Sequence, residues 1–319
     1  MDRRRILQLG AGLMLGAALP ACSPAGDKGA VLKVGSQKGG AKALVLASGV
    51  LEGAPYRVEW SEFPAAQHLL EAIGAGAVDL GAVGDAPFLF AYAAGAPIKA
   101  VQASRSSGGG ASTAVLVRGD SPLTSAAQLK GRRVATGRGS IGHFLLLKVL
   151  EREGLKRSDV DLVFLAPGDA KAAFATGAVD AWVTWGSYVA LAIEHDGARV
   201  LSDGRGLLSG YGFEVAGDRA IAGKSAELTD FLRRLAQAKR WVGGHRDEYA
   251  KVLAKETGLE LSIAAYTVAN TRGEPVPIDQ AVIGELSEVL AVFRAAGELK
   301  AAPEVGAAFA PAFNAALTS

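Results

Sequence analysis

The tetrapeptide Gly-Ala-Val-Asp occurs twice in this chain, at residues 76–79 and at residues 177–180. An Ala-rich helical pattern precedes each copy, and an apolar run that ends in a small-residue loop follows it. Farther upstream, both halves show a strand pattern, a polar loop and a helix pattern, at an offset near 100 residues. This repeated unit predicts two similar α/β lobes that face each other across a cleft, where a ligand can be held.

The bulk composition is that of a globular protein. The 319 residues are enough for two domains with separate cores, and 50% of them are hydrophobic and 21% charged. The net charge is +2, and removing residues 1–21 leaves 31 basic and 31 acidic side chains. Because no basic excess remains to neutralise phosphates, the composition argues against nucleic-acid binding.

Residues 1–21 have the pattern of an export signal peptide. Three consecutive arginines are followed by an apolar stretch at residues 7–19, which is too short to span a bilayer comfortably. The sequence Leu-Pro-Ala-Cys at residues 19–22 resembles a bacterial lipoprotein cleavage box, so we expect a lipidated Cys22, a tether at residues 22–30 and a periplasmic protein held at the membrane. Two alternatives stay open: cleavage elsewhere, which would give a soluble secreted protein, and twin-arginine rather than general export.

The rest of the chain divides into an alternating region and a helical tail. Strand and helix patterns alternate up to about residue 213, which predicts parallel sheets. Four helix patterns follow, and Pro275 and Pro277 separate the last two. We expect a first lobe of residues 31–115 plus 212–319, on which the tail packs, and a second lobe of residues 116–211. The chain would cross between the lobes twice and form a hinge.

Four loops are expected to line the cleft, because ligands of open parallel sheets bind beyond the carboxyl ends of strands, at helix N-termini. These loops are residues 36–40, 84–87, 138–143 and 185–188. Their Gly and Ser residues allow close approach to the backbone, and helix N-termini favour anions. We therefore predict a small organic anion as ligand, with Gln37, Ser140 and Ser187 as neutral donors. Trp185 would cover its organic part, while Trp182 would lie in the core.

Signs of catalysis are few. The chain has no nucleophile elbow, no phosphate-binding loop and no His-Glu-x-x-His motif, and its four histidines lack metal-ligand spacing. His143 and Asp85 are the nearest candidates for a catalytic pair across the cleft. Asp79 and Asp180, which end the two repeats, are interpreted as turn residues that bond local backbone. We therefore expect a protein that is not an enzyme and that uses no cofactor and no metal.

Several segments resemble the aliphatic-sulfonate-binding proteins of ABC importers and their taurine- and nitrate-binding relatives. The segments are Val34-Gly-Ser-Gln-Lys38, Gly84-Asp-Ala-Pro87, Leu129-Lys-Gly-Arg-Arg-Val134, Gly139-Ser-Ile-Gly-His143, Val179-Asp-Ala-Trp182 and Trp185-Gly-Ser-Tyr188. They occur in the family's order and spacing from about residue 31 to residue 297. The resemblance implies a type II periplasmic-binding-protein fold, capture of a sulfonate in the cleft, and delivery to a membrane permease.

The resemblance also implies ligand positions at or beside Gln37, Asp85, Ser140, His143 and Trp185. Together with the loops, the candidate ligand-binding residues are Gln37, Gly39, Gly84, Asp85, Ala86, Gly139, Ser140, His143, Trp185 and Ser187. The chain departs from the family at residues 186–187, where Gly-Ser stands in place of a frequent Asp-Pro, and at Glu214, beside Phe213, where an aromatic residue is common. We therefore expect a larger or differently charged sulfonate, or a sulfate ester.

Three functions fit these observations. The first is a monomeric solute-binding lipoprotein of an importer. The second is an enzyme on the same fold, similar to thiamine-pyrimidine synthases, which the export signal and the absence of a Cys-rich stretch disfavour. The third is a lipoprotein that binds a ligand and signals to a partner. The sequence does not separate the first from the third.

Overall fold

The computed structural model describes residues 29–37, 40–106, 108–271, 273–301 and 303–317. The predicted signal peptide, the lipidated Cys22, most of the tether and the candidate site residue Gly39 lie outside these ranges. In the described part of the chain, no helix combines the length and the apolar composition needed to cross a membrane.

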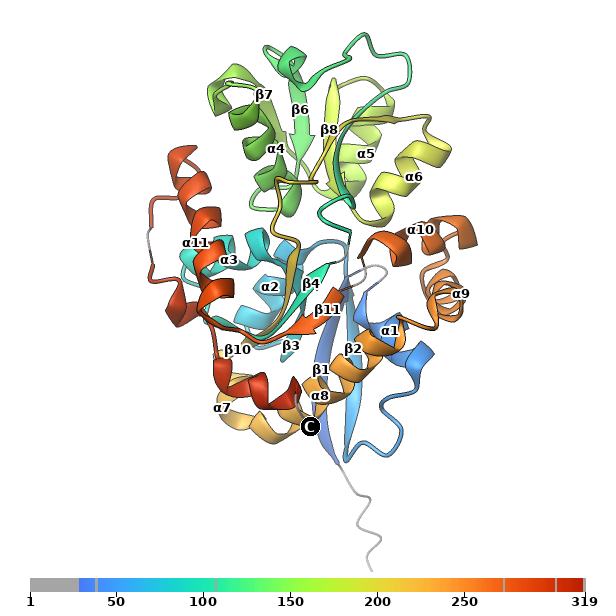
Figure 1. Ribbon diagram of the computed structural model, residues 1–319, viewed down its shortest axis with the longest axis vertical. Coiled ribbons are helices and arrows are strands. Elements are labelled where there is room, and N and C mark those ends of the chain that lie inside the picture. Colours follow the sequence, from blue (N-terminus) through green and yellow to red (C-terminus); the bar gives the residue numbers. More distant parts are fainter. Residues whose placement is uncertain (1–28, 38–39, 107, 272, 302, 318–319) are drawn as a thin grey trace, which may run out of the picture.

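The described residues form two α/β lobes, one above the other in Figure 1, as the repeat predicts. The first lobe holds a six-stranded sheet with the order β11-β4-β10-β3-β1-β2. Its strands are β1 (Ala30–Gln37), β2 (Tyr56–Phe63), β3 (Leu80–Gly84), β4 (Ile98–Ser106), β10 (Tyr211–Gly217) and β11 (Gly273–Val276). The second lobe holds a five-stranded sheet with the order β7-β6-β8-β5-β9. Its strands are β5 (Thr113–Val117), β6 (Arg133–Thr136), β7 (Asp161–Phe164), β8 (Ala181–Trp185) and β9 (Arg199–Asp203).

Helices cover the sheets of both lobes. The second lobe contains α4 (Ile141–Arg152), α5 (Pro167–Ala175) and α6 (Ser187–His195). The first lobe and the tail contain α1 (Ala41–Ser48), α2 (Ala66–Gly74), α3 (Asp85–Ala93), α7 (Asp218–Gly223), α8 (Ser225–Trp241), α9 (Arg246–Thr257), α10 (Leu261–Thr271) and α11 (Gln280–Ala295). Short 3-10 helices occur at Ala126–Leu129, Arg157–Asp159, Gly306–Ala308 and Pro311–Leu317.

Each lobe has its main apolar clusters built on its own sheet. In the first lobe, one cluster includes the buried rings of Phe88 and Phe213, and another is centred on Phe231 of α8. In the second lobe, α4 and β8 contribute one cluster, and Phe174 packs on Trp182 in another, with ring centroids 5.9 Å apart. Full burial of one such side chain is worth about 1.5–3 kcal/mol, so each lobe has the core that a separate domain requires.

Both sheets are mixed: the prediction of parallel sheets holds for the pairs β1–β2, β1–β3, β6–β7 and β6–β8 and fails for the others. Strand β10 runs antiparallel to β3 and β4, and β5 runs antiparallel to β8 and β9. These are the strands that follow the two crossings between the lobes. They start at the cleft and run away from it, whereas the strands that they pair with end at the cleft.

The crossings also correct the expected lobe boundary. All of β5 from Thr113 onward pairs in the second sheet, so the first crossing lies between Ser106 and Thr113 and not after residue 115. The second lies between Asp203 and Tyr211, close to the expected place. The short length of β5 and its apolar composition could not show which sheet it joins.

The tail contacts both lobes and contributes strand β11 to the first sheet. This strand was not predicted, because Pro275 and Pro277 indicated only a break between two helices. Strand β11 pairs antiparallel with β4 at the edge of the sheet. Proline is tolerated on an edge strand because it has no N–H group to donate, and an edge strand has a neighbour on one side only. Helix α10 packs on α6 of the second lobe, and α11 packs on both α3 and α4. In Figure 1 these two helices stand on opposite sides of the cleft region. The tail therefore covers the first lobe, as expected, and also flanks the second.

The repeated Asp residues connect neighbouring strands. Asp79 Oδ2 accepts a hydrogen bond from the backbone N of Lys33 at 2.7 Å, and Asp180 Oδ2 accepts the equivalent bond from Arg133 N at 2.9 Å. The donors lie 46 and 47 residues upstream, so the interpretation of Asp79 and Asp180 as bonding local backbone was wrong. Each tight turn brings its carboxylate to a neighbouring strand, β1 in the first lobe and β6 in the second, so the two copies of the repeat make the same structural contact.

Candidate functional site

Two adjoining cavities of about 280 and 320 Å³ lie between the lobes. They share several lining residues from both lobes, namely Gln37, Ala82, Val83, Ser104, Trp185, Gly186, Gly212 and Gly273. The smaller one is bounded by the first residues of α1 and α6, and we call it the α1–α6 cavity. The larger one is bounded by the first residues of α3 and α4, and we call it the α3–α4 cavity. The four predicted loops thus meet in pairs, one loop from each lobe in each pair.

The α1–α6 cavity receives two helix N-termini that have glycine at the N-cap. Gly40 precedes α1 and Gly186, with φ of 59°, precedes α6. Neither glycine offers a side-chain acceptor to the first-turn N–H groups, so these donors face the cavity without a cap from that position. Gln37 is held beside them, because its Nε2 donates to the carbonyl of Ala82 at 2.7 Å. Ser187, 5% exposed, also lines this cavity.

At the α3–α4 cavity, side chains already accept hydrogen bonds from first-turn N–H groups of both helices, although α3, like α1 and α6, has a glycine (Gly84) at its N-cap. Asp85 Oδ1 accepts a hydrogen bond from Ala86 N at 2.6 Å in the first turn of α3, and its Oδ2 accepts one from Ser209 Oγ at 2.5 Å. Ser140 Oγ accepts one from His143 N at 3.0 Å and caps α4. Burial raises the pKa of the Asp85 carboxyl, against the opposing effect of its hydrogen bonds. This cavity is therefore less suited to an added anion than its neighbour.

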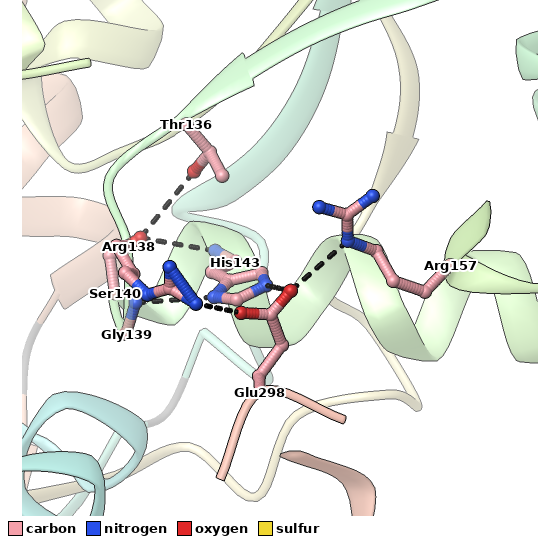
Figure 2. A network of polar contacts seen from close by, with 7 residues as sticks. All are labelled: Thr136, Arg138, Gly139, Ser140, His143, Arg157 and Glu298. Atoms are coloured by element: carbon pink, nitrogen blue, oxygen red, sulfur yellow. Dashed lines mark hydrogen bonds and ion pairs between the residues drawn. The ribbon is translucent and has the colours of Figure 1, made fainter. Parts of the chain in front are cut away.

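His143 is not among the described residues that line either cavity. Its ring is fully buried, edge-on to Phe164 and Phe293, and its Nδ1 accepts a hydrogen bond from Gly139 N at 3.2 Å (Figure 2). The Nε2 atom faces Glu298, 3.9 Å from Oε1. Burial lowers the pKa of His143 to about 4, although the nearby Glu298 carboxylate opposes this shift. The imidazole therefore supports the Gly139–Ser140 loop through the bond to Gly139 N and does not line either of the two cavities.

Glu298 forms ion pairs with two arginines next to His143. Arg138 donates to its Oε2 at 2.6 Å and Arg157 to its Oε1 at 3.1 Å, while Glu298 itself is only 6% exposed at its side chain (Figure 2). The guanidinium of Arg138 also lies over the ring of Phe164, 4.8 Å from its centre. Arg138, the first residue of the predicted loop at 138–143, is thus already paired.

The two tryptophans of β8 lie on opposite faces of the strand, as the inward–outward alternation predicts. Trp182 is 1% exposed in the core, and Trp185 is half-buried and lines both cavities. Of the other candidates, Gly84 lines the α3–α4 cavity and Ala86 is buried within α3. Gly139 lines a separate hollow beside Phe90 and Phe164.

An ion pair lines the α1–α6 cavity in addition to the predicted residues. Lys239 Nζ of α8 lies 3.1 Å from Oε1 of Glu214, which is on β10 and 2% exposed. The sequence pattern singled out Glu214 only as a departure from a resemblance, and Lys239 was missed because it sits in an ordinary amphipathic helix. Within the described residues, no group of three or more His, Cys, Asp or Glu side chains is arranged to hold a metal ion.

Comparison with known proteins gives consistent results. The family model described as "NMT1/THI5 like" matches residues 58–238. A protein of Escherichia coli (strain K12) named "Putative aliphatic sulfonates-binding protein" is 36% identical over 237 residues, which are 73% of this chain and 74% of that protein.

Solved structures extend the similarity to the fold. The alkanesulfonate-binding protein SsuA from Xanthomonas axonopodis pv. citri, bound to MOPS, is 34% identical, with a TM-score of 0.82 over 88% of this chain and 98% of that one. The desulfurization enzyme DSZB is 18% identical, with a TM-score of 0.65 over 90% and 99% of the two chains. At that identity the second likeness shows the fold alone.

Proposed function

This chain belongs to the NMT1/THI5-like family, and we propose that it is an extracytoplasmic solute-binding protein of an ABC importer that captures an organosulfonate or a related small organic anion between its lobes. The observation that carries the proposal is the α1–α6 cavity, where two helix N-termini from opposite lobes start at glycine N-caps. The names of the relatives, which are sulfonate-binding proteins, support the same ligand class.

The cavity suits a sulfonate for a physical reason. A sulfonate stays ionised at any physiological pH and presents three acceptor oxygens, which backbone N–H groups at helix N-termini can satisfy without a neutralising cation. Ser187 and Gln37 add neutral polar groups, and the ring of Trp185 with Leu44 offers apolar surface to the organic part. Because α1 and α6 belong to different lobes, an anion bound to both stabilises the closed arrangement of the hinge.

The remaining candidate residues take supporting roles in this proposal. Asp85 and Ser140 accept hydrogen bonds from first-turn N–H groups of α3 and α4, and together with Gly84 they line the adjoining α3–α4 cavity. His143 positions the loop through the Gly139 amide.

The variants Ser187→Asp and Ser187→Asn test the placement of the anion. Both change the first residue of α6, where a carboxylate is compatible with the helix dipole, so both proteins should fold. The carboxylate would occupy the position proposed for the ligand anion and repel it. We expect calorimetric titration with alkanesulfonates to show little or no binding to Ser187→Asp and binding within a few-fold of wild type for Ser187→Asn. Equal affinities for both variants would place the anion elsewhere.

We propose that the protein binds its ligand without converting it. The relatives of 30% identity or more reported above are named as binding proteins, and the likeness to an enzyme is one of fold. Mass spectrometry after prolonged incubation should recover the sulfonate unchanged. Release of sulfite or sulfate above a buffer control would contradict this part of the proposal.

We also propose a periplasmic monomer, anchored through a lipidated Cys22, that delivers its ligand to a membrane permease. The pattern of residues 1–22 and the sulfonate-binding relatives support this. Intact-mass measurement of the protein from the membrane fraction should show a diacylglyceryl adduct that Cys22→Ser removes. An unmodified mass with equal release of both forms into the soluble fraction would refute the anchor.

A further inference from the structure

Glu214 lines the α1–α6 cavity, and one oxygen of its carboxylate lacks a donor within the described residues. Glu214 is 2% exposed, and Lys239 Nζ binds its Oε1 at 3.1 Å. In the part of the chain that the structure describes, Oε2 of Glu214 is buried and has no hydrogen-bond partner. Leaving such an acceptor unsatisfied is costly, so an oxygen in this position calls for a donor from outside the chain.

A second acceptor beside it has the same deficiency. Gln102 on β4 is the register partner of Glu214, so the two residues are adjacent across the strands. Its Nε2 donates to the carbonyl of Leu232 at 3.0 Å, which fixes the orientation of the amide. Its Oε1 is buried and, among the described residues, also has no partner. Two neighbouring acceptors without donors mark this part of the first sheet as a polar site.

The surroundings of Glu214 define what kind of donor fits. Lys239 already neutralises the carboxylate, so an added ammonium would meet the positive charge of Lys239 at short range. A neutral donor meets no such repulsion. Besides this pair and the first residues of α1 and α6, the cavity is lined by apolar residues such as Leu44 and Leu235. A ligand that spans the cavity would therefore be anionic at one end, apolar along its length and able to donate a hydrogen bond at the other.

We propose that Glu214, held by Lys239, is a second polar subsite that accepts a hydrogen bond from a hydroxyl or similar neutral donor at the end of the ligand remote from its anionic group. The proposal rests on the proposed function, since it assumes that the anion lies at the N-termini of α1 and α6. It assigns the ligand to the hydroxylated organosulfonates, and it gives the departure at Glu214 a role in specificity.

The first experiment is calorimetric titration of the wild-type protein with alkanesulfonates of two to five carbons, each compared with its ω-hydroxy and ω-ammonium analogue. At the chain length that reaches Glu214, we expect the hydroxyl to tighten binding by about tenfold to 100-fold, which corresponds to a hydrogen bond to a charged acceptor. If simple alkanesulfonates bind and the hydroxyl adds nothing at any length, the subsite proposal fails and the proposed function stands. A preference for the ammonium series also overturns the subsite as described. If no sulfonate binds, both proposals fail.

The second experiment removes the subsite. Glu214→Leu with Lys239→Met replaces a buried ion pair by apolar side chains of similar volume, a change that proteins often tolerate. The affinity ratio of hydroxylated to plain sulfonate should then fall to about one. The same two substitution types at the surface ion pair of Lys148 and Glu288, 2.6 Å apart, form the matched control and should keep the wild-type ratio.

A single variant covers the case in which the double variant does not fold. Glu214→Gln keeps the size of the side chain and removes its charge, so the hydroxyl preference should drop severalfold. A preference that persists at the wild-type value in a folded Glu214→Gln or double variant shows that the hydroxyl binds elsewhere and overturns the proposal.

Discussion

The buried imidazole of His143 should make the stability of the protein depend on pH in the mildly acidic range. Burial lowers its pKa from 6.5 to about 4, against the attraction of Glu298 and with the help of Arg138 and Arg157. Between these two values the unfolded chain binds a proton that the folded protein does not bind. The free energy of unfolding that this group contributes is therefore fully present above pH 6.5 and is lost as the pH falls towards 4.

The size of the effect follows from the shift. A difference of about 2.5 pKa units corresponds to about 3 kcal/mol over the whole window, of which about 2 kcal/mol is lost between pH 7 and pH 5. The ring is fully buried, so solvent screening does not reduce this figure much. That is a substantial part of the 5–15 kcal/mol typical of a folded domain.

Urea unfolding of wild type and His143→Asn at pH 7, 6 and 5 measures this contribution. Asparagine can still accept the hydrogen bond from Gly139 N but does not titrate. Carboxyl groups affect both proteins equally, so the stability difference between them isolates the histidine. We expect wild type to lose about 2 kcal/mol relative to the variant from pH 7 to pH 5. His68→Asn, at an exposed position of α2, controls for removing a surface histidine. A difference that stays constant across this range would refute the reasoning.

Two further substitutions test the placement of side chains around the cleft. Trp185→Ala should weaken sulfonate binding by about 1–3 kcal/mol in calorimetric titration, because its ring lines both cavities, and should leave folding intact. Trp182→Ala should instead lower the free energy of unfolding by about 3–5 kcal/mol, because its ring is in the core. Gly139→Ala should destabilise more than Gly131→Ala in urea unfolding: both have positive φ (65° and 74°), but a Cβ at 139 would lie 2.5 Å from Phe90 Cδ1, whereas one at 131 meets nothing within 4 Å. Equal losses in the free energy of unfolding would show that the Phe90 ring moves away from the new Cβ atom at no cost.

Local patterns predicted the lobes well. The alternation of strand and helix patterns that the sequence shows up to about residue 213 corresponds to alternating strands and helices in both lobes. The repeat also located both halves of the cleft. These features depend on neighbours within a few residues, so the sequence carries them directly.

Features that depend on which strands are neighbours could not be predicted from local sequence patterns. The direction of β10, the edge strand at Pro275 and the bond from Lys33 to Asp79 each join segments far apart in the chain. Hydrophobic patterning shows that a segment is buried, but it does not show which strand lies beside it or which way that strand runs.

The candidate site shows the same division. By itself the sequence determined that four loops containing Gly or Ser would meet at a cleft, because a strand, a turn and a helix start are all encoded locally. It could not rank the loops, since each of them combines a glycine with the start of a helix. Only the tertiary structure decided that Ser209, 124 residues away, donates a hydrogen bond to Asp85 at the start of α3, and that Glu298, more than 150 residues from His143, lies beside the buried imidazole. It also brought Lys239 and Glu214 together in the cavity at which α1 and α6 start. The physical reason is that ion pairing and burial are relations between distant segments, which exist only once the chain has folded.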